Sequence, residues 1–433
     1  MFLSKIVSSS VLTGLFMVFA AQGQTLNTLH AFSKNELGYQ PLTGVLVGSN
    51  GAVYGTTLFG GASNIGVLYG LVPPTSPGGA WTESVLHSFS KQVGDAQPSG
   101  PPLFGPDGAL YGLTYESVYQ LKPSGGSGKR VETVLKVFTG LNGDAQNATG
   151  ALVFGSDHSL LGTACAGGPA PYPNGIVFRL SPPAAPGATW TETVLYAFSG
   201  YLGDGICPQG GLVIARDGTL YGVTKYGGLY AGTAFQLSPP AAPGEPWGES
   251  ILYEFGSQPG DAGLPNGVVL GPNGVLYGTT MGNTNSRYCS NGCGSVFQLS
   301  PPTAPGGAWT ETILHTFTGD PGNDGTTPTS PPVLGPGGVL YGTANAGGGS
   351  VGPDGGTGTI WELIPPSSPG EPWTYTTLYV FTGGLTGAFP NAVTFGPDGN
   401  LYGTTTFGGG VSGNQVHNQG TVFQFVLPPA PVR

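Results

Sequence analysis

A Leu-Tyr-Gly core or a close variant of it recurs seven times along this chain, and the recurrence limits the fold more strongly than any other feature. The copies are centred near residues 54, 111, 161, 221, 277, 341 and 402. Tandem units of this length are typical of folds in which each repeat is one supersecondary unit and neighbouring units share a core. We therefore interpret the chain as an array of similar modules.

Each unit contains four extended segments. The first is short and apolar, and it ends at a turn such as Asp107-Gly108 or Asn273-Gly274, with Asp157-His158 as the irregular copy. These dipeptides supply the positive φ of tight hairpins, so we expect the first two segments to pair antiparallel. The second segment is the "LYGTT" element, and the third, such as "GSVFQLSPP", ends at prolines that cannot continue a ladder. The fourth, such as "WTETVLYAF", alternates between two faces.

Four antiparallel strands repeated seven times predict an all-β fold, a seven-bladed β-propeller of four-stranded antiparallel blades. The segment 26–32 has the pattern of a fourth strand, whereas 420–429 has the pattern of a third strand. We therefore expect the N-terminal strand to complete the last blade, close the ring and cover a sheet edge. Gly and Pro are abundant enough to raise the question of disorder, but 11% aromatic residues argue for a packed core.

Residues 1–23 have the features of an export signal. Lys5 supplies the positive charge, the stretch 6–21 is mostly apolar, and Ala21-Gln22-Gly23 offers small residues for cleavage. An uncleaved anchor is the alternative, although the stretch is short and rich in serine for a membrane span. We expect residues 24–433 to form a single propeller domain that is secreted or periplasmic, monomeric and without a membrane span.

Charge and cysteine content narrow the function classes. Only 8% of residues are charged, with 22 acidic against 12 basic, and no basic cluster exceeds the pair Lys129-Arg130. A nucleic-acid-binding surface therefore lacks its electrostatic footprint. Four cysteines suit disulfides in an oxidising compartment. We expect a local Cys289–Cys293 bridge and a second bridge between Cys165 and Cys207, because zinc needs more ligands than these loops offer.

The patterns "DGxLYGTTxxGG", "GxVFxLxPP" and "LHxFxGxxDGxxP" resemble the GloVer-type tandem repeats of secreted bacterial proteins. The resemblance covers essentially the whole chain after the export signal, and it implies export and a repeat fold. It brings no catalytic residues with it. Some members carry a C-terminal anchor, and nothing after Phe425 resembles one.

A residue that recurs in most copies most simply has a structural role in the blade. A functional site is instead expected at residues that differ from copy to copy. His30, His87 and His315 share one position of the fourth segment with Lys136 and three tyrosines, so we interpret them as structural. We also interpret the tryptophans at the start of the fourth segments as structural, with their rings packed between blades. They are Trp81, Trp190, Trp247, Trp309 and Trp373.

One aspartate recurs in the loop from a fourth segment to the next first segment. A ring of such carboxylates at the channel mouth could hold Ca²⁺ or bind sugar hydroxyls. The interpretation we favour is that each carboxylate accepts hydrogen bonds from the amides of its own turn. The residues are Asp95, Asp144, Asp204, Asp261 and Asp324.

Residues outside the repeat are the stronger candidates for ligand contact. They lie in the loops after the second segments, which emerge on the same face as the aspartate loops, and loops on a rigid scaffold commonly carry function. The candidates are Tyr172, Arg287, Tyr288, Asp354 and His417, and Glu116 is a further lone carboxylate.

No nucleophile elbow, zinc-protease motif, phosphate loop or dinucleotide fingerprint occurs in the chain. The sequence favours an extracytoplasmic binding or scaffolding module, with a glycan or surface polymer as ligand. The alternative is a glycan- or lactone-active enzyme that uses the channel-mouth carboxylates, with Ca²⁺ as the one cofactor considered. A third hypothesis is partner docking through Pro-rich loops such as "SPPAAPGATW".

Overall fold

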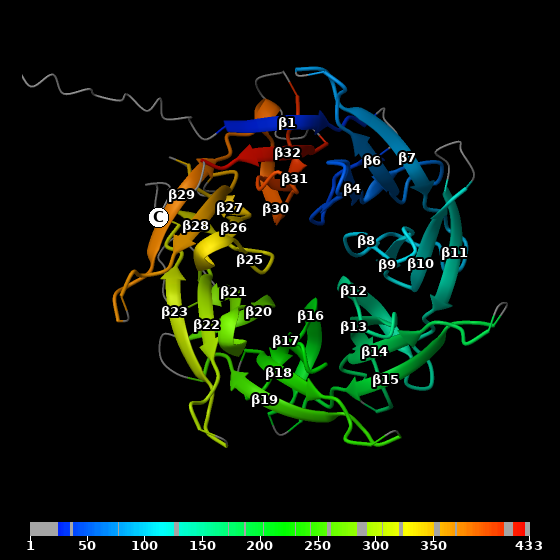
Figure 1. Ribbon diagram of the computed structural model, residues 1–433, viewed down its shortest axis with the longest axis vertical. Coiled ribbons are helices and arrows are strands. Elements are labelled where there is room, and N and C mark those ends of the chain that lie inside the picture. The colour runs from blue at the N-terminus through cyan, green and yellow to red at the C-terminus, as the bar shows by residue number, and fades with distance from the viewer. Residues whose placement is uncertain are drawn as a thin grey trace, which may run out of the picture.

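Seven four-stranded antiparallel sheets stand around a central axis in the computed structural model, as the blades of a β-propeller (Figure 1). The prediction of an all-β, seven-bladed propeller is therefore confirmed. The structure describes residues 25–428 apart from 35–37, 77, 125–129, 172, 186–187, 202, 230, 243, 258–260, 284–291, 305, 320–323, 350–355, 369 and 411–418. No helix within these ranges is long and apolar enough to cross a membrane.

The first four blades follow one another along the chain, each beginning at the axis and ending at the outside. Blade one contains β3 (Leu46–Val47), β4 (Val53–Thr56), β6 (Val67–Val72) and β7 (Thr82–Ser88). Blade two contains β8 (Leu103–Phe104), β9 (Leu110–Thr114), β10 (Ser117–Pro123) and β11 (Arg130–Val137). Blade three contains β12 (Ala145–Phe154), β13 (Leu160–Gly167), β14 (Ile176–Ser181) and β15 (Thr191–Ala197). Blade four contains β16 (Gly205–Ile214), β17 (Leu220–Gly227), β18 (Thr233–Ser238) and β19 (Gly248–Glu254).

The remaining blades repeat this order. Blade five contains β20 (Ala262–Leu270), β21 (Leu276–Asn283), β22 (Ser295–Ser300) and β23 (Thr310–Thr316). Blade six contains β25 (Val333–Leu334), β26 (Leu340–Ala344), β28 (Thr359–Ile364) and β29 (Thr374–Val380). Blade seven contains β30 (Ala388–Phe395), β31 (Leu401–Phe407), β32 (Thr421–Val426) and β1 (Thr25–Ala31). Two short pairs, β2 (Gly38–Tyr39) with β5 (Phe59–Gly60) and β24 (Gly325–Thr326) with β27 (Ala346–Gly347), extend blades one and six. Single 3₁₀ turns are η1 (Pro272–Gly274), η2 (Pro336–Gly338) and η3 (Gly384–Thr386).

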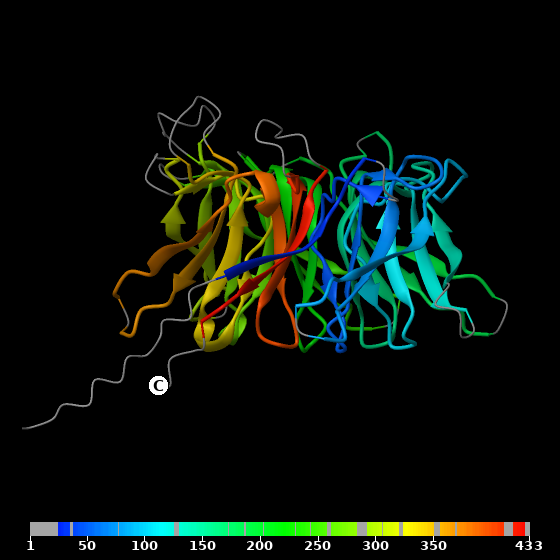
Figure 2. The ribbon, with the colours of Figure 1, turned by 90° about the horizontal axis from the view of Figure 1, so that it is seen from above.

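The N-terminal strand closes the ring. β1 pairs antiparallel with β32, with Thr25 opposite Val426 and Ala31 opposite Thr421, so the last blade takes its outer strand from the start of the chain. Figure 1 shows the two strands side by side, and Figure 2 shows the blades standing around the ring with their strands running between its two faces. The predicted closure is confirmed.

Aromatic contacts between neighbouring blades explain the glycine of the Leu-Tyr-Gly core. The phenylalanine that follows each outer strand contacts a ring on the third strand of the next blade, as Phe89 contacts Tyr119 with ring centroids 5.3 Å apart. The Tyr119 ring in turn lies directly over Gly112, where a Cβ atom would overlap it. Both rings are fully buried. Because edge-to-face aromatic pairs add to the free energy of burial, this repeated contact stabilises each junction between blades.

The hairpin turns between first and second strands are longer than predicted. In blade two Gly105 N donates to Ala109 O (2.9 Å), so three residues, 106–108, form the loop. Gly108 carries the positive φ of 73°, and the Asp107 carboxylate accepts a hydrogen bond from Ala109 N. A three-residue hairpin loop with a left-handed final residue explains why glycine follows the aspartate.

Left-handed residues that are not glycine lie near the start of four inner strands, β12, β16, β20 and β30. Cys207 has φ of 60° and Leu264 has φ of 57°. Such a conformation is costly for a residue with a Cβ atom. It turns each backbone amide toward the preceding blade, where Cys207 N donates to Asn174 O (2.8 Å) and Leu264 N to Ala231 O (2.9 Å). These hydrogen bonds join neighbouring blades close to the axis and offset the conformational cost.

The predicted disulfide between Cys165 and Cys207 is present, and it joins β13 of blade three to β16 of blade four. For the other predicted bridge, Cys289 lies outside the described residues, whereas Cys293 is disulfide-bonded.

Removal of the Cys165–Cys207 bridge should lower the free energy of unfolding. The bridge closes a segment of 42 residues, and loop-closure entropy for that length corresponds to about 4 kcal/mol. Chemical denaturation of a Cys165→Ala, Cys207→Ala double variant should therefore give a lower midpoint, and the slope should not fall, because the unfolded chain becomes less compact without the bridge. An unchanged midpoint would mean that the bridge does not constrain the unfolded chain.

Candidate functional site

The repeated aspartates bind their own turns. Asp144 Oδ2 accepts hydrogen bonds from Thr139 N (2.7 Å) and from the Thr139 hydroxyl (2.7 Å). The other four aspartates accept the same pair of bonds from a serine or threonine a few residues earlier in the chain. The pairs are Ser90 with Asp95, Ser199 with Asp204, Ser257 with Asp261, and Thr318 with Asp324. One carboxylate oxygen of each aspartate thus accepts the hydrogen bonds that stabilise its own turn.

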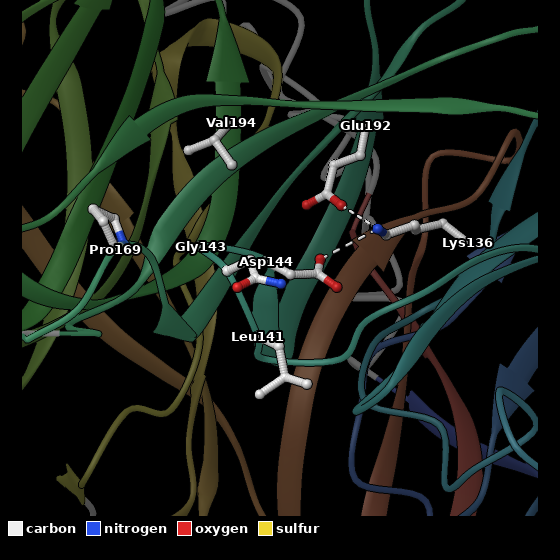
Figure 3. A pocket seen from close by; sticks show the side chains of 8 residues that line it. Lys136, Leu141, Gly143, Asp144, Pro169, Glu192 and Val194 are labelled. Atoms are coloured by element: carbon white, nitrogen blue, oxygen red, sulfur yellow. Dashed lines mark ion pairs between the residues drawn. The ribbon is translucent and has the colours of Figure 1, made fainter.

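Each of these aspartates also contacts a side chain of its own blade's outer strand, at the junction with the next blade. At the junction of blades two and three, Lys136 Nζ lies 3.3 Å from Asp144 Oδ1 and 2.6 Å from Glu192 Oε2 (Figure 3). Glu192 comes from β15, the outer strand of blade three. These side chains line a surface cavity of about 500 Å³ together with Leu141, Pro169 and Val194. The lysine ammonium therefore bridges two carboxylates that belong to different blades.

The same position is filled by different side chains around the ring. His87 Nε2 lies 2.9 Å from Asp95 Oδ1 and 3.5 Å from Glu132 Oε1. Tyr253 donates from its hydroxyl to Asp261 (3.0 Å) and to Glu311 (3.3 Å). The interpretation of the histidines as structural agrees with these contacts.

The sequence analysis missed the glutamates of these junctions. They occupy the second or third residue of the outer strands, in segments such as "TES" and "TET", and their recurrence was the available signal. They are Glu83, Glu132, Glu192, Glu249 and Glu311.

Electrostatics differ between junctions according to the side chain between the carboxylates. Burial raises the pKa of Glu311 to about 9, and the neighbouring Asp261 carboxylate adds to the effect. Burial and Asp204 raise the pKa of Glu249 to about 7. Burial would also raise the pKa of Asp144, but hydrogen bonds from Thr139 and the ammonium of Lys136 outweigh it and hold that pKa below its ordinary value. At a junction with tyrosine the glutamate therefore retains its proton to higher pH, whereas the junction with lysine holds an ion pair.

One described group has the composition of a metal site. His87, Asp95 and Glu132 each offer a ligand atom, and these atoms lie within 4.8 Å of one another. An imidazole nitrogen suits transition metals better than the hard, oxygen-seeking Ca²⁺. A calcium site at the five aspartates remains a prediction, with each aspartate in the turn of a different blade.

A cavity of about 730 Å³ occupies the central channel, and residues of all seven blades line it. Its described lining contains neither a carboxylate nor an imidazole, and Lys225 is the one charged side chain there. The other polar side chains of the lining carry amides and hydroxyls, and the Ser99 and Thr149 hydroxyls among them are buried without a described hydrogen-bond partner. The amides belong to Gln209, Asn266, Asn345 and Asn391.

Several channel amides are fixed by bonds between blades. Asn266 Nδ2 donates to Pro328 O (2.7 Å), and Asn345 Nδ2 donates to Pro390 O (3.2 Å). The Oδ1 atoms of both residues accept no hydrogen bond from a described residue. Because the donor side of each amide is anchored, the acceptor is held in a fixed place beside the cavity.

The residue after each "LYGTT" element breaks the symmetry most completely. No two of the seven copies are alike at this position, and five of them line the channel cavity. Tyr115 is 38% exposed, and its hydroxyl makes no hydrogen bond with a described residue. Lys225 makes no ion pair within the described ranges. The copies are Leu58, Tyr115, Cys165, Lys225, Met281, Asn345 and Thr406.

The predicted loop candidates, apart from Glu116, stay a prediction. Tyr172, Arg287, Tyr288, Asp354 and His417 lie outside the described residues. Glu116 is exposed in the turn between β9 and β10, where its backbone oxygen accepts a hydrogen bond from Phe138 N (2.7 Å). Its carboxylate has no described partner.

Comparison with sequence families gives one match. The profile of the Gloeobacter/Verrucomicrobia repeat matches residues 7–235, 116–351 and 230–430, three overlapping ranges that cover most of the chain. No curated protein matches the sequence.

Solved structures share the fold at low identity. The extracellular domain of a hybrid two-component system from B. thetaiotaomicron has a TM-score of 0.52 and 10% identity, over 92% of this chain and 41% of that one. The extracellular domain of a one-component system from the same organism has a TM-score of 0.51 and 12% identity, over 94% and 43%. A gluconolactonase from Xanthomonas campestris has a TM-score of 0.41 and 14% identity, over 80% and 91%. At these identities the likeness concerns the fold alone.

Proposed function

The chain belongs to the Gloeobacter/Verrucomicrobia repeat family, and we propose that it is an extracytoplasmic binding protein whose central channel takes a neutral, hydroxyl-rich polymer such as a glycan. The observation that carries the proposal is the channel lining. It presents amides and hydroxyls from seven blades, and its described residues include no acid and no imidazole. Such a surface offers hydrogen bonds in both directions, as sugar hydroxyls require.

The unpaired groups of the channel favour a ligand of this kind. The Tyr115 ring offers an exposed apolar face, and the side chain of Gln209 makes no hydrogen bond with a described residue. Ligand sites typically combine apolar surface with a few fixed polar groups. A cavity of about 730 Å³ is large enough for an oligosaccharide unit.

The enzyme alternative depends on carboxylates at the channel. Hydrolysis of a glycoside uses a pair of carboxyl groups flanking the scissile bond, and lactone opening needs a general base or a metal. The described lining contains no carboxylate, and the repeated aspartates accept hydrogen bonds in their own turns. Binding is therefore the function we propose.

The disulfide supports an extracytoplasmic location, because disulfides persist in oxidising compartments. The proposed export signal at 1–23 lies outside the described residues and is consistent with this location.

Substitution of Tyr115 tests the proposal. Calorimetric titration with neutral hexaoses of the cello, xylo and malto series should identify a ligand for the wild type. Tyr115→Ala should weaken its binding at least about tenfold, because a sugar ring loses its aromatic face. Tyr201→Ala is the matched control, since Tyr201 is 52% exposed and does not line the channel.

Two outcomes would overturn the proposal. One is a wild-type protein that binds none of these oligosaccharides or the corresponding polysaccharides. The other is a Tyr115→Ala variant that binds as tightly as the wild type.

A further inference from the structure

Three departures from the repeat converge at the junction of blades three and four, at the end of the strands opposite the aspartate loops. Leu161 stands where the six other copies have tyrosine. Arg179, its partner on β14, stands where four copies have glutamine. Arg216 stands in the hairpin turn of blade four, where four other copies have proline.

The residues replaced here have defined roles in other blades. In blade two, Tyr111 donates from its hydroxyl to Asp107 Oδ2 (3.1 Å), and Gln120 Nε2 donates to the same oxygen (3.0 Å). The Tyr111 ring also contacts Trp190 of the next blade, with centroids 6.3 Å apart. Tyrosine and tryptophan thus close the equivalent position at that junction.

The same tyrosine–tryptophan contact recurs twice more. Tyr221 contacts Trp309 and Tyr277 contacts Trp373, at centroid distances of 6.1 and 5.8 Å. Because residue 161 is leucine, Trp247 has no tyrosine ring to contact at this junction. Trp247 makes no aromatic contact with any residue that the structure describes. Trp247 is half-buried, and its ring is therefore available on the side where tyrosine would lie.

A groove of about 290 Å³ results, and Leu161, Arg179, Arg216, Pro239 and Trp247 contribute to its lining. The groove combines an aromatic ring, apolar walls and two guanidinium groups. Its size is near the lower end of the range for small-molecule sites.

The charges of the groove favour an anion. Arg179 forms an ion pair with Asp157 through one terminal nitrogen, but its Nε is buried without a hydrogen-bond partner. Arg216 is exposed and makes no ion pair with a described residue. Two guanidinium groups thus face one carboxylate, in a chain whose formal net charge is −10. The exposed Arg216 lacks an acceptor among the described residues, and an anionic ligand would supply one.

We propose that this groove binds an acidic sugar residue of a glycan. The sugar ring packs against Trp247, and its carboxylate or sulfate accepts hydrogen bonds from the guanidinium groups of Arg216 and Arg179. Guanidinium groups recognise such oxyanions through paired, charge-assisted hydrogen bonds. The groove is separate from the central channel, so this proposal does not depend on what the channel binds.

The other blades supply substitutions that the fold already accepts. Arg216→Pro and Arg179→Gln introduce the residues most frequent at these positions, and Leu161→Tyr restores the ring that fills the position elsewhere. Titration of the intrinsic tryptophan fluorescence would use trigalacturonate, a sulfated heparin disaccharide and neutral xylotriose as probes. Ser49→Pro, at the corresponding turn position of blade one, is the control for a proline in this hairpin.

We expect the wild type to bind at least one acidic probe at least tenfold more tightly than xylotriose. Arg216→Pro and Arg179→Gln should each weaken that binding at least tenfold. Leu161→Tyr should weaken it more than either arginine variant does, and its thermal midpoint should equal that of the wild type. Ser49→Pro and Tyr115→Ala should bind the acidic probe as the wild type does. A preference for trigalacturonate identifies a carboxylate ligand, and a preference for the heparin disaccharide identifies a sulfate.

Three results would overturn the proposal. They are absence of binding to both acidic probes, equal binding of xylotriose, and unchanged affinity in the two arginine variants. Because Tyr115→Ala probes the channel and the arginine variants probe the groove, failure of one site leaves the result for the other intact.

Discussion

A chain that begins at residue 34, and so lacks β1 and Phe32, is expected to lose the cooperative unfolding transition of the full chain. β1 supplies the outer strand of blade seven through its pairing with β32. Phe32 is 2% exposed, contacts Tyr69 of blade one, and donates from its backbone nitrogen to Gly420 O (2.9 Å). Without these residues the ring loses the segment that joins its first and last blades, and β32 becomes an open sheet edge.

Circular dichroism melts and size-exclusion chromatography would measure this effect. Phe32→Ala keeps the chain intact and should cost about 3–5 kcal/mol of unfolding free energy, as buried phenylalanine substitutions do. Asn27→Ala, on an exposed residue of β1, should change the stability by less than about 0.5 kcal/mol. A synthetic peptide of residues 24–33 should restore the transition of the truncated chain by strand addition. A truncated chain that melts within a few degrees of the full chain would show that β1 does not close the ring.

Glu311→Gln is expected to stabilise the protein in neutral and alkaline solution and to leave it almost unchanged near pH 4.5. Burial and Asp261 raise the folded-state pKa of Glu311 to about 9 from its ordinary value of 4.5. The proton bound at this junction therefore contributes stability that is complete below pH 4.5 and is lost as the pH rises through 9. A neutral amide avoids that loss and still accepts the hydrogen bond from Tyr253. We expect a gain on the order of 2 kcal/mol at pH 8.

Urea denaturation at intervals between pH 4.5 and 9 would measure the gain. Lys136→Met is the informative contrast, because it leaves Asp144 and Glu192 facing each other without the ammonium that bridges them. That variant should be destabilised by about 2 kcal/mol or more at pH 8, since breaking a partly buried ion pair leaves charge uncompensated. If Glu311→Gln and the wild type lose stability in parallel across this range, Glu311 does not hold a proton in the folded state.

The repeated parts of the fold could be predicted because they depend on residues close in sequence. The hairpin glycines, the prolines that end third strands and the alternating fourth strands each specify local geometry, and their sevenfold recurrence specifies the ring. The start of the chain could be assigned to the last blade because its pattern completes a unit that lacks an outer strand.

The junctions between blades could not be derived in the same way. Glu192 meets Lys136 across 56 residues of sequence, and no local signal identifies that partner. The glutamate recurs in five outer strands, but its role follows only from the side chain opposite it, which changes from lysine to histidine to tyrosine around the ring.

The candidate sites show a similar division. The sequence predicts ligand contacts in the long loops, and the structure adds departures from the repeat at Tyr115 and Lys225 in the channel and at Leu161 in a groove. Leu161 is a tolerated variant of the core when the sequence is considered alone. Its consequence depends on Trp247, Arg179 and Arg216, which come together only after blades three and four have packed.

Hydrogen exchange measured with and without a bound oligosaccharide would test the central claim, that the channel takes the ligand, most directly. We expect slower exchange in the segments 97–101, 149–151, 209–211 and 264–268, which lie in or just before the inner strands of consecutive blades, with no change in the outer strands. Slower exchange confined to the outer strands or the Pro-rich loops, with the inner strands unaffected, would contradict it.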